Sequence, residues 1–242
     1  MGSSGKSYDT VLQDIERRLR TGELAIGDRL PGERAMAQDY AISRASVRDA
    51  VRILSVLGVV RSAPGSGPDS GTQIIAEPSL GLSNALRLHM ASSSLAAEDV
   101  IETRELLECW GAREAARRLD GSDPSRTEHL HELLHRMDAD GISAEEFHLL
   151  DTQFHTELTA LSGNAVIETI MGSLRDAIRT YVMEGVARLE SWEDVADGLR
   201  AEHRAILQAV DAGDGDEAAR LVAAHIRGFY SLRRAALGFA DA

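Results

Sequence analysis

Residues 28–60 read DRLPGERAMAQDYAISRASVRDAVRILSVLGVV, and this stretch decides the fold of the first part of the chain. The pair Leu30-Pro31 opens a predicted helix, because proline is well tolerated in the first helical turn. Ser43 is the predicted N-cap of a second helix, and Gly58 ends that helix. The second helix carries an apolar stripe at helical spacing: Val47, Ala50, Val51 and Leu54. Two short helices joined by a tight turn are therefore predicted.

The other face of the second helix carries Arg44, Arg48 and Arg52, which are spaced by four residues. Arginine bonds phosphate oxygens and binds guanine with two hydrogen bonds. The first turn of the second helix is where a helix-turn-helix contacts base edges. The pattern favours a surface that reads the major groove. Spacing alone leaves open an ordinary pair of helices whose arginines are solvated.

The order of residues in this stretch resembles the winged helix-turn-helix of GntR-family transcription regulators. That pattern runs G-D-x-L-P-S-E-R-x-L-A, then V-S-R-x-P-V-R-x-A-L, then L-x-x-x-G-L-V. This chain departs from it mildly, at Gly32, Ile42, Ala45 and Val51. The resemblance implies that Arg34, Arg44 and Arg48 contact a double-stranded DNA operator. We expect the neighbouring Ser43 and Ser46 to contact it as well.

A hairpin follows, with strands expected at 59–60 and 73–76 and a turn-rich tip, RSAPGSGPDSGT, at 61–72. It would form the wing, and the resemblance implies that a wing glycine approaches the minor groove. Gly67 and Gly71 are the leading candidates beside Gly65. The alternative is a flexible hairpin without DNA contact.

The chain of 242 residues is long enough for two domains, and its net charge of −13 is unevenly distributed. Residues 1–78 hold ten Lys/Arg and ten Asp/Glu, so the whole negative excess lies in residues 79–242. We expect a DNA-binding domain at 1–78 and an acidic second domain at 79–242, which keeps DNA contact on the first. The single cysteine, Cys109, excludes an internal disulfide framework, and no apolar run is long enough for a membrane span. A cytoplasmic protein without membrane contact is expected.

The second domain reads as entirely helical, and the expected fold class is mostly α. Helices are predicted at 79–91, 97–119, 123–138, 143–161, 164–187, 191–211 and 215–238. Two of them begin with capping boxes, Ser143 with Glu146 and Asp214 with Glu217. Short loops between about seven helices favour an antiparallel bundle. The full chain is thus a winged helix-turn-helix followed by a helical bundle.

Asp151 and His155 are spaced i, i+4 in one helix, so both project from one face. His203 and His225 lie in two later helices with apolar neighbours at helical spacing. A carboxylate and three imidazoles that meet in a bundle core suit a borderline divalent ion. The alternative is a set of separate core histidines satisfied by hydrogen bonds.

The second domain resembles the FCD ligand-binding domain of the FadR subfamily, in the segments D-x-x-F-H, S-G-N and E-H-x-x-I-L. The resemblance implies that Asp151, His155, His203 and His225 hold a divalent metal, zinc first and nickel or manganese next. It also implies that Arg104, in R-x-x-L-E, lines an effector pocket, and we add Asn164 of the S-G-N segment as a second effector contact. The alternative for Arg104 is an exposed ion pair with Glu108 at i+4.

Together these features predict a homodimeric, ligand-responsive transcription regulator, with a repressor expected, that binds a palindromic operator. Its effector is expected to be a small carboxylate that meets both the metal and Arg104. One alternative is a metal sensor with no organic effector, which would use the same ligands. Another is a metal-dependent hydrolase with Glu157 or Glu202 as base, although the chain has no H-E-x-x-H motif. The leading interpretation is not an enzyme.

Overall fold

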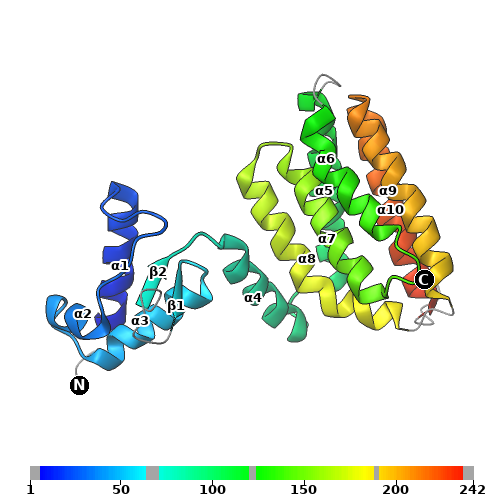
Figure 1. Ribbon diagram of the computed structural model, residues 1–242. Helices are drawn as coiled ribbons and strands as arrows, with labels where there is room; N and C mark the ends of the chain where they lie inside the picture. The colour runs from blue at the N-terminus through cyan, green and yellow to red at the C-terminus, as the bar shows by residue number, and fades with distance from the viewer. Residues whose placement is uncertain (1–5, 64–70, 120–123, 188–190, 237–242) are drawn as a thin grey trace. The chain divides into compact units, whose positions relative to one another are not determined.

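The computed structural model describes residues 6–63, 71–119, 124–187 and 191–236 (Figure 1). The chain divides into two compact units, Met1–Ala85 and Leu86–Ala242. The described residues are mostly helical, as the sequence predicts, with a small antiparallel hairpin in the first unit.

The first unit contains three helices and two strands. They are α1 (Lys6–Thr21), α2 (Glu33–Asp39), α3 (Arg44–Val56), β1 (Val60–Ala63) and β2 (Gly71–Ile74). The strands pair antiparallel in the register Val60↔Ile74 to Ala63↔Gly71. This is a helix-turn-helix with a wing, whose strands run further toward the tip than the sequence indicated. Gly65 and Gly67 fall outside the described residues.

The start of α2 differs from the prediction. The helix begins at Glu33, with Gly32 as its N-cap, so Leu30-Pro31 does not open it. The backbone N–H of Leu30 donates instead to the carbonyl of Thr72 at 2.8 Å, and Arg29 forms an isolated bridge with Gln73. Because this short segment pairs with the wing, its backbone is extended rather than helical.

The apolar stripe of α3 packs into the core of the first unit. Ser43 caps α3 as predicted, accepting a hydrogen bond from the N–H of Ser46 at 3.0 Å. Gly58 ends the helix with a φ of +71°, where glycine is favoured. The buried core joins α1, α3 and the hairpin through Val11, Ile15, Leu24, Leu30, Met36, Val47, Ala50, Val51, Leu54, Val60 and Ile74.

Helix α4 (Pro78–Ala91) is followed by a helical bundle, drawn from green to red in Figure 1. Its elements are α5 (Ala97–Leu119), the 3-10 turn η1 (Pro124–Thr127), α6 (Glu128–Met137), α7 (Ala144–Ala160), α8 (Ala165–Val186), α9 (Trp192–Asp211) and α10 (Gly215–Ala236). Helix α5 packs against α7, α8, α9 and α10, so it is central to the bundle. No helix in the described part of the chain is long and apolar enough to cross a membrane.

Side-chain caps fix where several bundle helices begin. Ser143 accepts from the N–H of Glu146 at 3.2 Å, and Asp214 accepts from the N–H of Glu217 at 3.0 Å, as the capping boxes predict. Asn164 caps α8 by accepting from the N–H groups of Val166 and Ile167. Such caps set the start of each helix and therefore which side chains face the core.

Candidate metal centre and DNA-binding surface

Four potential metal ligands meet inside the bundle. Asp151 and His155 come from successive turns of α7, His203 from α9 and His225 from α10. One ligand atom of each residue lies within 4.8 Å of the corresponding atoms of the others. The three histidines are buried and Asp151 is partly buried. The structure thus brings together the four residues singled out in the sequence.

The Nε2 atoms of the histidines point at one another and at the carboxylate. Nε2 of His155 lies 3.1 Å from Nε2 of His203 and 3.2 Å from Nε2 of His225. Oδ1 of Asp151 lies 3.0 Å from Nε2 of His203, 3.5 Å from that of His155 and 3.9 Å from that of His225. A tetrahedral zinc with ligands at about 2.0–2.1 Å separates its ligand atoms by about 3.3 Å. The separations in the cluster scatter around that value.

Two carboxylates lie behind two of the three histidines. Nδ1 of His155 faces Oε2 of Glu108 at 2.8 Å, although its angle is outside that of a good hydrogen bond. Nδ1 of His225 lies 2.7 Å from Oε2 of Glu202. A proton on Nδ1 of these two rings, on the side of the carboxylate, leaves Nε2 as a lone pair directed at the centre of the cluster. Nδ1 of His203 has no hydrogen-bond partner among the described residues. Lone pairs facing one another at this distance call for a cation between them, so the residues fit a divalent metal.

A buried arginine anchors the carboxylates on the other side of the cluster. Arg175 on α8 donates to Oδ2 of Asp151 and to Oε2 of Glu108, both at 2.8 Å. Arg104 donates to Oε1 of Glu108 through Nε at 2.9 Å and Nη2 at 2.8 Å. Both arginines and Glu108 are buried. The four charged groups Arg104, Arg175, Glu108 and Asp151 balance to zero.

The pKa shifts agree with this charge arrangement. Burial would raise the pKa values of Glu108 and Asp151, but the neighbouring arginines and histidines hold both well below their ordinary values. Burial lowers the pKa values of His203 and His225, against the opposing pull of Asp151 and Glu202. Ionised carboxylates and neutral imidazoles are the states in which these groups bind metal.

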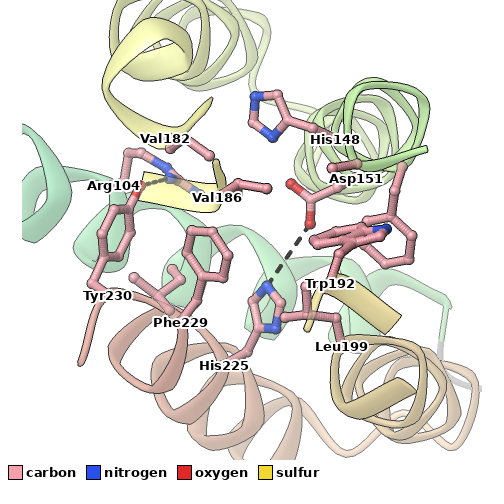
Figure 2. Close-up of a pocket in the computed structure, with 13 residues that line it drawn as sticks. Arg104, His148, Asp151, Val182, Val186, Trp192, Leu199, His225, Phe229 and Tyr230 are labelled. Carbon is pink, nitrogen blue, oxygen red and sulfur yellow. Dashed lines mark hydrogen bonds and ion pairs between the residues drawn. The ribbon is translucent and has the colours of Figure 1, made fainter. Parts of the chain in front are cut away.

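A pocket of about 480 Å³, part of it open to solvent, adjoins the cluster (Figure 2). Asp151 and His225 belong to both the cluster and the pocket wall. Most of the remaining wall is apolar or aromatic. An apolar wall with a few convergent polar groups is typical of small-molecule sites.

Arg104 lines this pocket, as its motif implied, and it also forms the ion pair with Glu108 that was the alternative. The pair is buried, so the expectation of an exposed bridge was wrong. Nη1 of Arg104 donates to the Tyr230 hydroxyl at 2.7 Å (Figure 2). The structure does not bring Asn164 to the pocket, because that side chain is exposed and caps α8.

His148 reaches the pocket from α7, one turn before Asp151. Its Nε2 is buried without a hydrogen-bond partner among the described residues. Burial lowers the pKa of His148, partly offset by Asp151, so the ring is neutral at pH 7. It offers one polar atom to a molecule in the pocket.

Sequence reasoning missed Arg175 and assigned Glu108 and Glu202 other roles. Arg175 lies in the buried stripe of α8 with Met171, Leu174 and Ile178, and a charged residue at such a position was the available signal. Glu157, the other base of the hydrolase alternative, pairs with His129 and Gln153 outside the cluster.

The candidate DNA-binding side chains lie around the turn between α2 and α3. Arg34, Ser43, Arg44 and Arg48 are exposed, and Ser46 is half-buried beside Ser43. Arg44 and Arg48 each come only within 3.9 Å of Glu33, with side chains 65% and 54% exposed, so both are held loosely. Gly71 begins β2 with a φ of +116°, which favours glycine. Gly67 is not among the described residues.

Two protein families match the chain. Residues 7–68 match the family of bacterial regulatory proteins called gntR, and residues 99–228 match the FCD domain. The second match covers more than half of the chain. The two matches together span both compact units.

Individual relatives agree with these matches. The chain is 28% identical over 209 residues to the HTH-type transcriptional regulator LutR of Bacillus subtilis, covering 86% of this chain and 92% of LutR. It is 27% identical over 218 residues to a proposed L-lactate dehydrogenase operon regulatory protein of Escherichia coli K12, covering 90% and 83%.

Among solved structures, a Streptococcus agalactiae GntR superposes with a TM-score of 0.60 at 25% identity, covering 95% of this chain and 98% of that one. The E. coli McbR/YncC structure has a TM-score of 0.52 at 16% identity, covering 97% and 99%, which supports the fold. The families and relatives are transcription regulators rather than enzymes. The chain therefore belongs to the GntR family as a member with an FCD domain, and it is a DNA-binding transcription regulator.

Proposed function

We propose that the helical unit binds one divalent metal through Asp151, His155, His203 and His225, and that a small carboxylate binds in the pocket beside it. Zinc is the first candidate, with nickel or manganese next. The observation that carries the proposal is that Asp151 and His225 belong to both the cluster and the pocket wall. When bound, the metal supplies a positive charge and an acceptor for an oxygen ligand.

The charges of the chain favour an anionic effector. The buried groups Arg104, Arg175, Glu108 and Asp151 already balance, and Glu202 adds one partly exposed negative charge behind His225. A divalent cation would leave this region with a net charge of about +1. A carboxylate in the pocket would neutralise that excess.

Tyr230 and Arg104 provide a second polar contact. The Tyr230 hydroxyl accepts from Arg104, so its own proton is free to be donated to a ligand oxygen. Tyr230 and Arg104 both line the pocket (Figure 2). A donor polarised by an adjacent guanidinium suits a carboxylate or carbonyl oxygen.

The name of one relative guides the choice of acids to test. One is named for the L-lactate dehydrogenase operon, and L-lactate is a small acid with a carboxylate and a hydroxyl group. We include lactate among the first acids to test. The pocket favours an organic effector over a pure metal sensor, because a sensor of metal alone has no use for a cavity beside the ligands.

On the DNA side, we propose that Arg34, Ser43, Arg44, Ser46 and Arg48 contact the operator, with Gly67 and Gly71 in the wing. The first unit supplies DNA contact, and the helical unit supplies ligand binding and most of a homodimer interface. Two-fold symmetry would match a palindromic operator. An effector regulates only as far as its affinity differs between DNA-competent and incompetent forms, typically about 1–3 kcal/mol of coupling.

The test begins with an operator selected from a pool of random duplexes by the purified full-length protein. Fluorescence anisotropy then measures operator affinity with and without zinc, and with and without L-lactate and other small acids. We expect an acid to change operator affinity about 5–150-fold, and only in metal-loaded protein. An effect that survives chelation and Asp151→Ala would show that the pocket works without metal. If zinc alone changes operator affinity and no acid does, the protein is a metal sensor.

A further inference from the structure

The wall of the pocket is mainly apolar away from the cluster. The apolar lining includes Val182, Val186, Trp192, Leu199, Ile226 and Phe229. In Figure 2, Phe229 lies between His225 and Tyr230, and Val182 and Val186 lie near Arg104. A ligand bound at the cluster therefore meets hydrocarbon and aromatic rings over much of its remaining surface.

The aromatic side chains offer a ligand few polar atoms. Nε1 of Trp192 donates to the carbonyl of Ile142 at 3.2 Å, and the ring packs edge-on against Phe147 at 5.3 Å. The Tyr230 hydroxyl accepts from Arg104 and keeps only its own proton for a ligand. The wall thus has few positions to satisfy the hydroxyls of a polyhydroxylated ligand. Each hydroxyl buried without a partner weakens binding.

Charge limits the ligand in the same way. With Glu202 counted, the metal-loaded region carries a net charge of about +1, which one carboxylate neutralises. Away from the metal, a second carboxylate on the ligand would meet the Tyr230 hydroxyl and Arg104, whose charge Glu108 already balances, among apolar side chains. His148 offers a single neutral polar atom, which is not a partner for another anion.

We propose that the effector is a monocarboxylic acid with a compact apolar body, which packs against Trp192, Leu199 and Phe229 while its carboxylate faces Asp151 and His225. This inference rests on the proposed function and names the chemical class of its effector. It separates such acids from sugar acids and from di- or tricarboxylates, which carry the same head group.

The test uses five acids that share a 2-hydroxycarboxylate end and differ in the rest of the molecule, with gluconate also opposite in configuration at C2. They are L-lactate, L-2-hydroxyisocaproate, L-3-phenyllactate, gluconate and L-malate. Calorimetry on zinc-loaded full-length protein gives each Kd, and elemental analysis gives the zinc content. We expect hydroxyisocaproate or phenyllactate to bind at least about tenfold more tightly than lactate. Gluconate and malate should bind no more tightly than lactate.

Phe229→Ala removes part of the apolar wall without touching a cluster residue. It should cut the gain in affinity of hydroxyisocaproate or phenyllactate over lactate at least about threefold. Phe229→Leu should retain most of the gain in affinity of the apolar acids over lactate. Trp110→Ala, an aromatic change outside the pocket, should leave that gain unchanged. Unaltered zinc content and an unaltered circular dichroism spectrum show that each variant is folded.

Two results would overturn the inference in distinguishable ways. Tighter binding of gluconate or malate than of both apolar acids would overturn the effector class and leave the proposed function standing. Absence of binding by all five acids to protein with full zinc content would overturn both the carboxylate effector and this inference.

Discussion

Arg175 holds one oxygen of Asp151 and leaves the other to the histidines. Its Nη1 donates to Oδ2 at 2.8 Å, while Oδ1 lies 3.0 Å from Nε2 of His203. The same guanidinium donates to Glu108, which faces Nδ1 of His155. One buried arginine thus orients a metal-ligand candidate directly and a second through an intervening carboxylate.

Arg175→Met should lower zinc affinity about 10–100-fold, because groups that orient metal ligands typically contribute that much. The measurement is competition with a chelator of known affinity. Arg179→Met is the matched control, since Arg179 lies one turn later on α8 with a 52% exposed side chain. Removing one partner of a buried ion pair costs about 3–5 kcal/mol, so circular dichroism must first show that the variant is folded. Equal zinc affinity in folded Arg175→Met and Arg179→Met would refute the role of Arg175.

His203→Ala should abolish stoichiometric zinc binding, since His203 contributes one of the four converging ligand atoms. His131→Ala is the control, because that side chain is 55% exposed and pairs with Asp211 on the surface. Elemental analysis of protein purified without chelator should give about one zinc per chain for the control. Equal zinc content in both variants, or no zinc in the wild type even after titration, would show that the clustered histidines are core residues and not metal ligands.

The helices could be predicted because their signals are local. The spacing of Val47, Ala50, Val51 and Leu54 and the cap at Ser43 depend only on neighbouring residues. Asp151 and His155 share a face for the same reason. The start of α2 was misplaced because Leu30 bonds to Thr72, far along the chain, and helix propensity carries no information about that partner.

The supporting charges of the cluster were harder to predict. Glu108 and Arg175 are 67 residues apart and meet only because α5 and α8 pack together. Read locally, Arg104 with Glu108 is an ordinary i, i+4 pair. Because the pair is buried, it belongs to a charge network in the core, where a charged residue must be paired. The arginine within the apolar stripe of α8 was the only local sign of this network.

Arg48→Ala should weaken specific operator binding by about 1–3 kcal/mol and relax base preference at one position. Arg48 is 54% exposed near the start of α3, where a recognition helix contacts bases. Arg52→Ala, one turn later and 76% exposed, should cause a smaller loss that is equal across sequences. Titration of the selected duplex at fixed salt measures both. Unchanged affinity in the alanine variants of Arg34, Arg44 and Arg48 would contradict the DNA-contact assignment.

Cys109 should react slowly with iodoacetamide at pH 8. Burial raises the pKa of its thiol to about 11, and its Sγ donates to the carbonyl of Ala219 at 3.3 Å. Only the thiolate reacts, so about one molecule in a thousand is reactive at pH 8 and the rate should rise about tenfold per pH unit up to pH 10. Urea-unfolded protein, with an ordinary thiol pKa, is the control. Equal rates in folded and unfolded protein at pH 8 would contradict the burial.

Gly58→Ala should destabilise the first unit far more than Gly22→Ala. Both glycines have a left-handed backbone, with φ of +71° and +75°. A Cβ at Gly22 meets nothing within 4 Å, whereas one at Gly58 would overlap the backbone carbonyl of Glu77. Backbone strain alone should lower the free energy of unfolding by about 1–2 kcal/mol in Gly22→Ala. In Gly58→Ala the overlap adds to this strain, so the total loss should be about 3 kcal/mol or more.

Hydrogen exchange of the α3 amides in increasing urea measures these losses in the first unit. Both tryptophans, Trp110 and Trp192, belong to the second unit, so the tryptophan fluorescence transition is an internal control that should not move. Equal losses in the two variants would mean that the chain relaxes around Gly58. A shifted tryptophan transition would mean that the two units unfold together, because a change confined to the first unit reaches the second only through cooperative unfolding.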